Sequence, residues 1–423
     1  MAHFVTSADI PVDGEHIAVD KVARIRRISG AIAAVGTVLS FAVLFGGLGG
    51  EKFQGNYAFS WLYAFFFFLT ITLGGCFWTL LHNVSNSGWG TSVRRVMENV
   101  GFCFPFMIVF AIPLLFPQVQ QFLYEWMSEH RAAGEKPGDL KENLHHSNHL
   151  LYAKHWYLNI PFWSARFFLY FLLLGFVIWR MRKFSIDQDT DPNPGTSRLF
   201  AARRFAAFGI PSFAVVLTFG AIDWVKGLDY TWFSTMWGVY VFAGSALNAM
   251  AVIIIVTILL RRKGYLKNVV GPEHDHLMGK LAFAFTVFWA YISFSQFFLI
   301  WYANITEETK FYLTRNTAFW NPYTIAFLVV GHFFIPFGVL LIQGLKKNPK
   351  VISAVAGWTL LMHLLDVYWI IIPERGPSLT KGQEYIISGS IFTDMLAWVS
   401  VAGLFGFAVI HFLGKASLYP CRD

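Results

Sequence analysis

Ten apolar segments, each about 20 residues or longer, recur along the chain and constrain its fold more than any other feature. An α-helix needs about 20 residues to cross the ~30 Å hydrocarbon core of a bilayer. The seventh segment, 277–302, would form a helix of about 39 Å. We place the segments at 28–48, 57–82, 96–116, 160–180, 204–224, 233–260, 277–303, 323–344, 351–372 and 390–413. The sequence therefore predicts an all-α integral membrane protein with about ten transmembrane helices.

The composition agrees with this fold class. Charged residues make up 14% of the chain, whereas soluble domains carry about 25%. The net charge of +8 could indicate a nucleic-acid partner, but the basic residues flank apolar segments in alternate loops. We therefore expect membrane lipids, and no nucleic acid, as partners. The polar start of the chain lacks the pattern of a secretory signal peptide, so we expect none.

The cysteine pattern argues against a cofactor held by this chain. Cys76, Cys103 and Cys421 are far apart, and the sequence has neither a CxxCH haem motif nor an iron–sulfur spacing. We expect no redox cofactor here, and any c-type haem or cluster would belong to a partner subunit.

Most of the 33 Lys and Arg residues fall in the loops on the side of the N-terminus, including the segments 180–204 and 261–263. The positive-inside rule places this side in the cytoplasm, and an even number of spans places the C-terminus there too. Segments 1–27 and 414–423 are then cytoplasmic. The long loop 117–159 lies on the opposite side, where a loop of this length is usually functional or a docking surface.

A weak internal repeat indicates how the helices are grouped. The segment FSWLYAFFFF from Phe59 resembles FSTMWGVYVF from Phe233. Further along, Asp223 followed by Trp224 resembles Asp366 with Trp369. The matches occur in the same order, which predicts two parallel four-helix bundles, 57–224 and 233–372, flanked by the helices 28–48 and 390–413.

Ionisable residues at membrane depth are costly and are therefore candidates for function. His332 lies near the middle of the eighth segment. Pro336, four residues later, cannot donate to the carbonyl of residue 332, so we expect a kink, a free carbonyl and a water-filled pocket. The alternative is a histidine hydrogen-bonded to a neighbouring helix.

His363 and Asp366 lie three residues apart on one helix face. This pairing fits a proton relay, and Gln296, Ser295 and Tyr291 could extend it. The alternative is a polar contact that joins helices. Together, His332 and His363 also allow a bis-histidine haem b.

Four further charged residues, Arg166, Asp223, Asp394 and Glu98, are candidates for the same path. Arg166 is expected either to pair with Asp223, Asp366 or Asp394, or to extend to the membrane interface. Glu98 is expected to be a cytoplasmic proton entry or a carboxylate favoured by a helix N-terminus.

Three segments resemble a known family. They are HDHLMGKLAFAFTVFWAYISFSQFFLIWYANITEE (274–308), WIIIPERGP (369–377) and LYPCRD (418–423). The chain resembles the NrfD/PsrC-like integral membrane proteins, in particular the F subunits (ActF) of bacterial alternative complex III, which is a quinol:electron-acceptor oxidoreductase. The resemblance covers nearly the whole chain from the first span on.

The resemblance implies a multi-pass subunit of the bacterial cytoplasmic membrane without its own redox cofactor. It implies partners that form a respiratory electron-transport complex: a homologous quinol-binding membrane subunit, an iron–sulfur protein and multihaem c cytochromes, with menaquinone or a related quinone. The implied function is assembly and proton conduction through buried polar residues. Two alternatives stay open. One is a quinone-binding subunit with a site near Arg166, Trp156 and the loop 145–155. The other is a secondary transporter.

Overall fold

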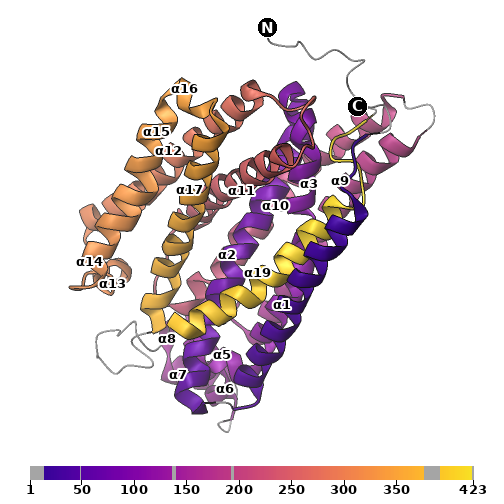
Figure 1. Ribbon diagram of the computed structural model, residues 1–423. Helices are drawn as coiled ribbons and strands as arrows, with labels where there is room; N and C mark the ends of the chain where they lie inside the picture. Colours follow the sequence, from indigo (N-terminus) through magenta and orange to yellow (C-terminus); the bar gives the residue numbers. More distant parts are fainter. Residues whose placement is uncertain (1–13, 48, 136–139, 192–194, 376–390, 422–423) are drawn as a thin grey trace.

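The computed structural model describes residues 14–421 except 48, 136–139, 192–194 and 376–390. Within these residues the chain forms helices, turns and loops, and ten of the helices are long and apolar enough to cross a membrane. This confirms the predicted all-α membrane fold (Figure 1). Parts of three predicted or quoted segments, 1–27, 369–377 and 418–423, lie outside the described residues.

Eight of the spans are built on one continuous helix each. These helices are α1 (Val19–Phe45), α2 (Gly50–Ser85), α9 (Ile160–Thr190), α10 (Ser197–Trp224), α11 (Trp237–Arg262), α12 (Pro272–Ala303), α17 (Pro349–Ile371) and α19 (Ile391–Leu413). Shorter helices in the connections are α5 (Pro117–Leu123), α6 (Glu125–Gly134), α7 (Leu140–Ser147), α8 (His149–Lys154), η5 (Lys226–Leu228), α13 (Thr306–Leu313), α16 (Gln343–Lys346) and η7 (Ile372–Glu374).

The third span is broken, where the sequence predicts one helix over 96–116. Its pieces are η2 (Gly88–Val93), α3 (Arg94–Gly101), η3 (Phe104–Met107), α4 (Ile108–Ala111) and η4 (Ile112–Leu115). Pro105 and Pro113 lie in the first turns of η3 and η4. Because proline has no amide N–H to donate, each interrupts the α-helical hydrogen bonds at that point.

The eighth span changes its helical type along its length. It consists of α14 (Trp320–Tyr323), the π-helix η6 (Thr324–Phe334) and α15 (Ile335–Leu341). In the i to i+5 pattern of a π-helix, Pro336 deprives the carbonyl of Gly331 of a donor rather than that of His332. The indole of Trp358 donates to the Gly331 oxygen at 2.8 Å. The expected free carbonyl is therefore displaced by one residue and is satisfied by a side chain.

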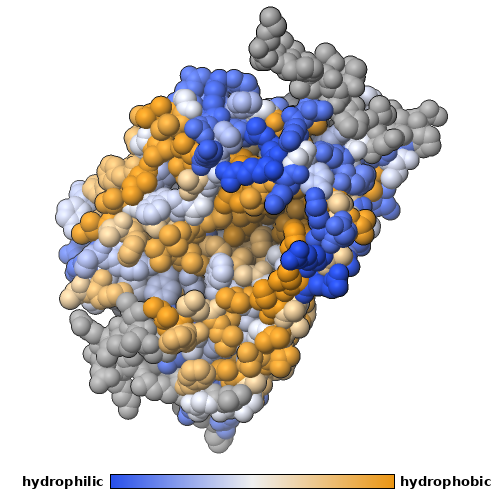
Figure 2. Space-filling model, in the orientation of Figure 1, coloured by the Kyte–Doolittle hydropathy of each residue, from blue (hydrophilic) through white to orange (hydrophobic). Residues whose placement is uncertain are grey.

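The two ends of the bundle are called the terminal face and the loop face. The terminal face holds both described chain ends, 14–18 and 414–421, which lie side by side: the Leu418 amide donates to the Glu15 carbonyl at 2.8 Å. The loop face holds α5 to α8 (Figure 1). Figure 2 shows hydrophilic residues gathered towards the terminal face and hydrophobic residues over much of the flank.

The helix α2 lies at the centre of the packing. We call the helices of the two predicted bundles, 57–224 and 233–372, the first and the second group. The helix α2 contacts α3 and α10 of the first group, α11 of the second group, and α19, which pairs with α1. Gly74 and Gly75 permit this: a Cβ on Gly74 would lie 2.0 Å from the Ser245 carbonyl oxygen, and one on Gly75 would lie 2.5 Å from the Gly101 nitrogen. Small residues let membrane helices approach closely, so α2 joins the two groups of helices directly.

Candidate buried proton site

A buried cluster surrounds Asp366, in the half of α17 nearer the loop face. Asp366 is 1% exposed, and its two carboxylate oxygens accept hydrogen bonds from different helices. Tyr240 of α11 donates its hydroxyl to Oδ1, and Trp289 of α12 donates its indole N–H to Oδ2 at 3.2 Å. Four of the eight continuous helices thus reach this point, because Thr70 of α2 joins the cluster through His363.

His363 connects the carboxylate to the other group of helices. Its Nδ1 atom lies 3.8 Å from Oδ2 of Asp366, one turn away on α17. Its Nε2 atom is 2.9 Å from the hydroxyl of Thr70. The predicted pair is therefore brought together. At 3.8 Å the Nδ1 atom makes no hydrogen bond to the carboxylate, and within the described structure only Nε2 of this imidazole is hydrogen-bonded.

His332 completes the cluster through ring contacts. It is fully buried, its ring centroid lies 3.9 Å from that of Trp289, and it is 6.4 Å from the ring centroid of His363. Neither ring nitrogen of His332 has a hydrogen-bond partner within the described structure. A buried polar group without a partner is costly, so this imidazole has capacity for a water molecule or a proton.

Asp223, which the weak sequence repeat aligns with Asp366, has a cationic partner. Asp223 accepts two hydrogen bonds from Arg166, at 2.8 and 2.9 Å, and one from Tyr170 at 2.6 Å. The guanidinium also stacks on Tyr157, 3.8 Å from the ring centroid. Arg166 is 6% exposed, so of the two expectations the pairing with Asp223 is correct and extension to the interface is wrong.

Asp394 forms a separate site near the loop face. Its Oδ1 atom accepts from Ser60 at 2.5 Å and from Arg375 at 2.9 Å. Arg375 is fully buried and also donates to Ser60, so this ion pair connects α2, α19 and the turn after α17. Asp394 therefore has its own cation and lies outside the Asp366 cluster.

Glu98 lies in a buried ionic network at the terminal face. Its oxygens accept from Arg94 at 2.8 Å and from Arg95 at 3.1 Å. Arg95 also pairs with Asp189 at the end of α9, which runs ten residues beyond its predicted end. Glu98 is 2% exposed, so it is not an open entry, and it lies beyond the first turn of α3, so it is not a helix-start carboxylate.

The three residues expected to extend the relay along α12 lie in different environments. Gln296 is buried, accepts from Ser234 at 3.2 Å and donates to Tyr312 at 3.3 Å. Tyr291 is 63% exposed on the lipid side, and Ser295 is half-buried. The structure gives neither of the last two a hydrogen bond to the Asp366 cluster.

A cleft of about 1290 Å³ leads from the loop face to this cluster. It lies between α12 and the eighth span. Its deep end is formed by Tyr240 and Trp289, both donors to Asp366, and Gln296 with Tyr312 lines the wall towards the loop face. The carboxylate is therefore separated from the cleft by two hydrogen-bonding aromatic side chains.

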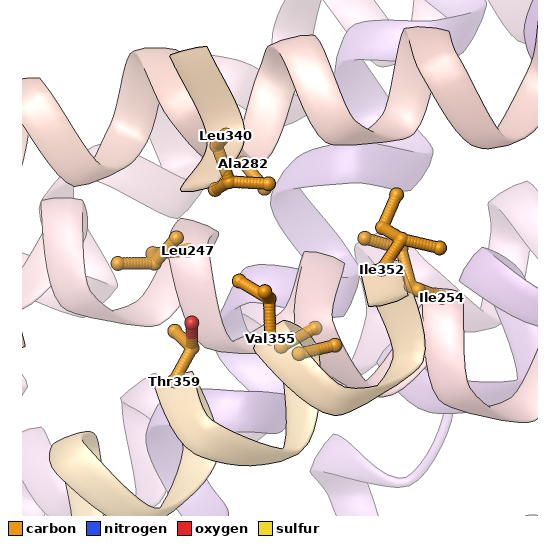
Figure 3. Close-up of a pocket in the computed structure, with 9 residues that line it drawn as sticks. Leu247, Ile254, Ala282, Leu340, Ile352, Val355 and Thr359 are labelled. Atoms are coloured by element: carbon orange, nitrogen blue, oxygen red, sulfur yellow. The ribbon is translucent and has the colours of Figure 1, made fainter. Parts of the chain in front are cut away.

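On the terminal side of the cluster the interior is apolar. A cavity of about 10 Å³ lies between α11, α12, α15 and α17, with Leu247, Ile254, Leu340 and Ile352 among its walls (Figure 3). Among the lining residues, Thr359, one turn before His363, has the one polar side-chain group, its hydroxyl. A buried water needs two to four polar partners, so this cavity is dry.

The two histidines proposed as alternative haem ligands have different surroundings. The ring of Trp289 is tilted by 39° over His332, whereas the Nε2 atom of His363 is hydrogen-bonded to Thr70. Within the described residues no group of three or more His, Cys, Asp or Glu side chains could hold a metal ion.

Sequence reasoning missed three hydrogen-bond partners in the cluster: Tyr240 and Trp289, which donate to Asp366, and Thr70, which contacts His363. Each is an ordinary residue of an apolar segment, and hydroxyl or indole groups are common at packed helix contacts. The only sequence signal was that Tyr240 lies in the repeated segment from Phe233. Their role depends on which helices surround α17.

Searches against protein-family models and curated proteins found no match.

Proposed function

We propose that this protein is a proton-conducting membrane subunit of a quinol:electron-acceptor oxidoreductase of the alternative complex III type, without a redox cofactor of its own. The resemblance of the three sequence segments supports the complex. Its partners would be a quinol-binding membrane subunit, an iron–sulfur protein and multihaem c cytochromes. Both termini would lie in the cytoplasm of a bacterium, and the loop face in the periplasm.

The observation that carries proton conduction is that, within the described residues, Asp366 has no Arg or Lys partner. Asp223, Asp394 and Glu98 each accept hydrogen bonds from a guanidinium, whereas Asp366 accepts from Tyr240 and Trp289 and has only an imidazole beside it. A buried carboxylate without a counter-charge is strongly disfavoured. The cluster therefore favours one bound proton, on the carboxylate or on an imidazole, and this proton can move between Asp366, His363 and His332.

The surroundings suggest the direction of proton exchange. The hydrated end would be the cleft wall of Gln296 and Tyr312, towards the loop face. The apolar cavity beyond Thr359 disfavours a proton path that continues along the same bundle. The contact between His363 and Thr70 would instead lead the proton to α2. This helix packs against α3, which contains Glu98.

The test is the proton-to-electron stoichiometry of the whole complex in proteoliposomes. We expect Asp366→Asn to abolish proton coupling while the tagged chain still co-purifies with its haem and iron–sulfur partners. Tyr240→Phe, which removes a donor to Asp366, should lower coupling. Tyr302→Phe is the matched control, because this side chain of α12 is 78% exposed and is not among the residues that line the cleft.

An unchanged stoichiometry in Asp366→Asn would contradict the proton path. Purification of the chain alone, without any haem or iron–sulfur subunit, would contradict the assignment to the complex. The two parts of the proposal thus have separate readouts.

A further inference from the structure

We propose that Lys346 of α16 and Lys280 of α12 form a binding site for the phosphate group of one anionic phospholipid at the terminal face. The acyl chains of this lipid would lie on the exposed apolar surface at the end of α15. The site lies near the start of α12, whereas Gln296 and Tyr312 line the cleft towards the loop face, so the inference is independent of the proposed proton path.

Lys346 is a buried cation without a counter-ion. It is 7% exposed, and its stem packs on α12: a Cβ added to Gly279 would lie 3.0 Å from its Cγ atom. Its ammonium group lies 5.6 Å from the ring centroid of Phe283, and this ring attracts a cation but has no net charge. Within the described residues the ammonium group forms neither an ion pair nor a hydrogen bond. A buried charge of this kind favours an anion beside it.

The charges around Lys346 strengthen the preference for an anion. Burial lowers the pKa of Lys346, and the charge of the nearby Lys280 lowers it further. Lys280 is exposed and, in the part of the chain that the structure describes, also has no ion pair. The adjacent Lys347 is already paired with Glu273 at 2.5 Å. One phosphate group between Lys280 and Lys346 would therefore relieve the repulsion between these two cations.

The depth of the two lysines corresponds to the phosphate groups of a bilayer. Trp301, which is 64% exposed, marks the interface at the loop face. From residue 301 back to residue 280, α12 rises about 32 Å, which matches the ~30 Å hydrocarbon core. Lys280 and the ammonium group of Lys346 beside Phe283 therefore lie at the opposite boundary of this core. An anion held at this level is part of a lipid rather than a solute from the water phase.

An apolar surface adjoins the two cations, as a lipid requires. Leu341 and Ile342, four to five residues before Lys346, are 59% and 54% exposed. Beside them the rings of Phe337 in α15 and Phe283 in α12 lie 5.3 Å apart. The end of the bundle at α16 is hydrophilic and the flank below it is hydrophobic (Figures 1 and 2). A phospholipid has its phosphate group and its chains in the same order, whereas free phosphate would use the cations alone.

The experiment is native mass spectrometry of the full chain from mixed micelles that contain equal amounts of phosphatidylglycerol and phosphatidylcholine. One cation near an anionic head group changes the affinity roughly fivefold, so two cations predict one retained phosphatidylglycerol, preferred roughly 25-fold. Lys346→Met keeps the stem on Gly279 and should lower this preference roughly fivefold. Lys280→Met, at an exposed position, should do the same without altering the interior. Lys415→Met is the matched control, because this exposed lysine lies beside the C-terminus, away from α16.

Thermal unfolding provides a second readout and separates a lipid from a free anion. In micelles of a neutral detergent, Lys346→Met removes a buried charge without a counter-ion and should raise the melting temperature. Added phosphatidylglycerol should stabilise the unaltered chain and Lys415→Met, but should stabilise Lys346→Met much less. Inorganic phosphate should not reproduce this stabilisation.

Three results would overturn the proposal. They are an unchanged lipid preference in Lys346→Met and Lys280→Met, an equal loss of preference in Lys415→Met, and stabilisation by inorganic phosphate that equals that by phosphatidylglycerol. Proton coupling is not a readout of these experiments, so their failure leaves the proposed proton path unaffected.

Discussion

The carboxylate of Asp366 lies 3.8 Å from the Nδ1 atom of His363, one turn away on α17. Asp223, which the weak sequence repeat aligns with Asp366, instead accepts hydrogen bonds from Nε and Nη2 of Arg166. The two buried aspartates thus have different partners. Asp223 belongs to an ion pair with a guanidinium, whereas Asp366 has an imidazole beside it.

This contrast predicts effects of different size on the free energy of unfolding. Asp223→Asn leaves the Arg166 cation buried without its partner and should lower the free energy of unfolding by about 3–5 kcal/mol. Asp366→Asn keeps an acceptor for Tyr240 or Trp289 and should change it by less than about 1 kcal/mol. Equilibrium unfolding in mixed micelles measures both, and a larger loss in Asp366→Asn would contradict the assigned charge states.

The π-helical segment predicts a coupling between Trp358 and Pro336. Trp358→Phe removes the donor to the Gly331 carbonyl and should cost about 1 kcal/mol. In a Pro336→Ala background the new amide at residue 336 can serve that carbonyl, so the same change should cost less. A double-mutant cycle measures the coupling, and additive effects would show that the indole hydrogen bond does not replace the missing amide.

The contact between α2 and α11 predicts a strong effect of one methyl group. Gly74→Ala would place a Cβ 2.0 Å from the Ser245 carbonyl oxygen, and the shift it forces should cost about 3 kcal/mol. Gly357→Ala is the control, because a Cβ there meets nothing within 4 Å and alanine favours a helix. Thermal unfolding of the two variants should therefore differ in sign, and equal melting temperatures would contradict this packing.

The loop face predicts a loss of local stability in acid. Burial lowers the pKa of His130 in α6 below its usual value of 6.5, and the neighbouring His155, whose ring stacks 5.6 Å away, and Arg131 lower it further. Below pH 6.5 the opened loop takes up a proton that the folded loop resists, so stability is full above pH 6.5 and falls as the pH drops.

Hydrogen exchange of residues 125–134 and 149–158 at pH 7.5 and 5.5 measures this effect. Each unit by which the pKa is lowered increases opening roughly tenfold at low pH. His130→Gln should remove most of the pH dependence, whereas His146→Gln, at an exposed position of α7, should leave it unchanged. A pH dependence that persists in His130→Gln would assign it to another group.

The sequence by itself determined the fold class and the ten spans. It also singled out the buried ionisable residues His332 on η6 and His363 with Asp366 on α17. Hydrocarbon thickness fixes the length of an apolar helix, and the cost of burying charge singles out residues such as His332 and Asp366. It also placed Pro336 at a disruption of the eighth span. These properties depend on residues that are near each other in the chain.

Only the tertiary structure decided which partner each buried group has. Arg166 could reach any of three aspartates in sequence terms, and the packing of α9 against α10 selected Asp223. The donors of Asp366 come from α11 and α12, and their place beside α17 follows from how the helices pack around it. Such contacts depend on small residues and side-chain shapes distributed over several spans, so no single segment encodes them.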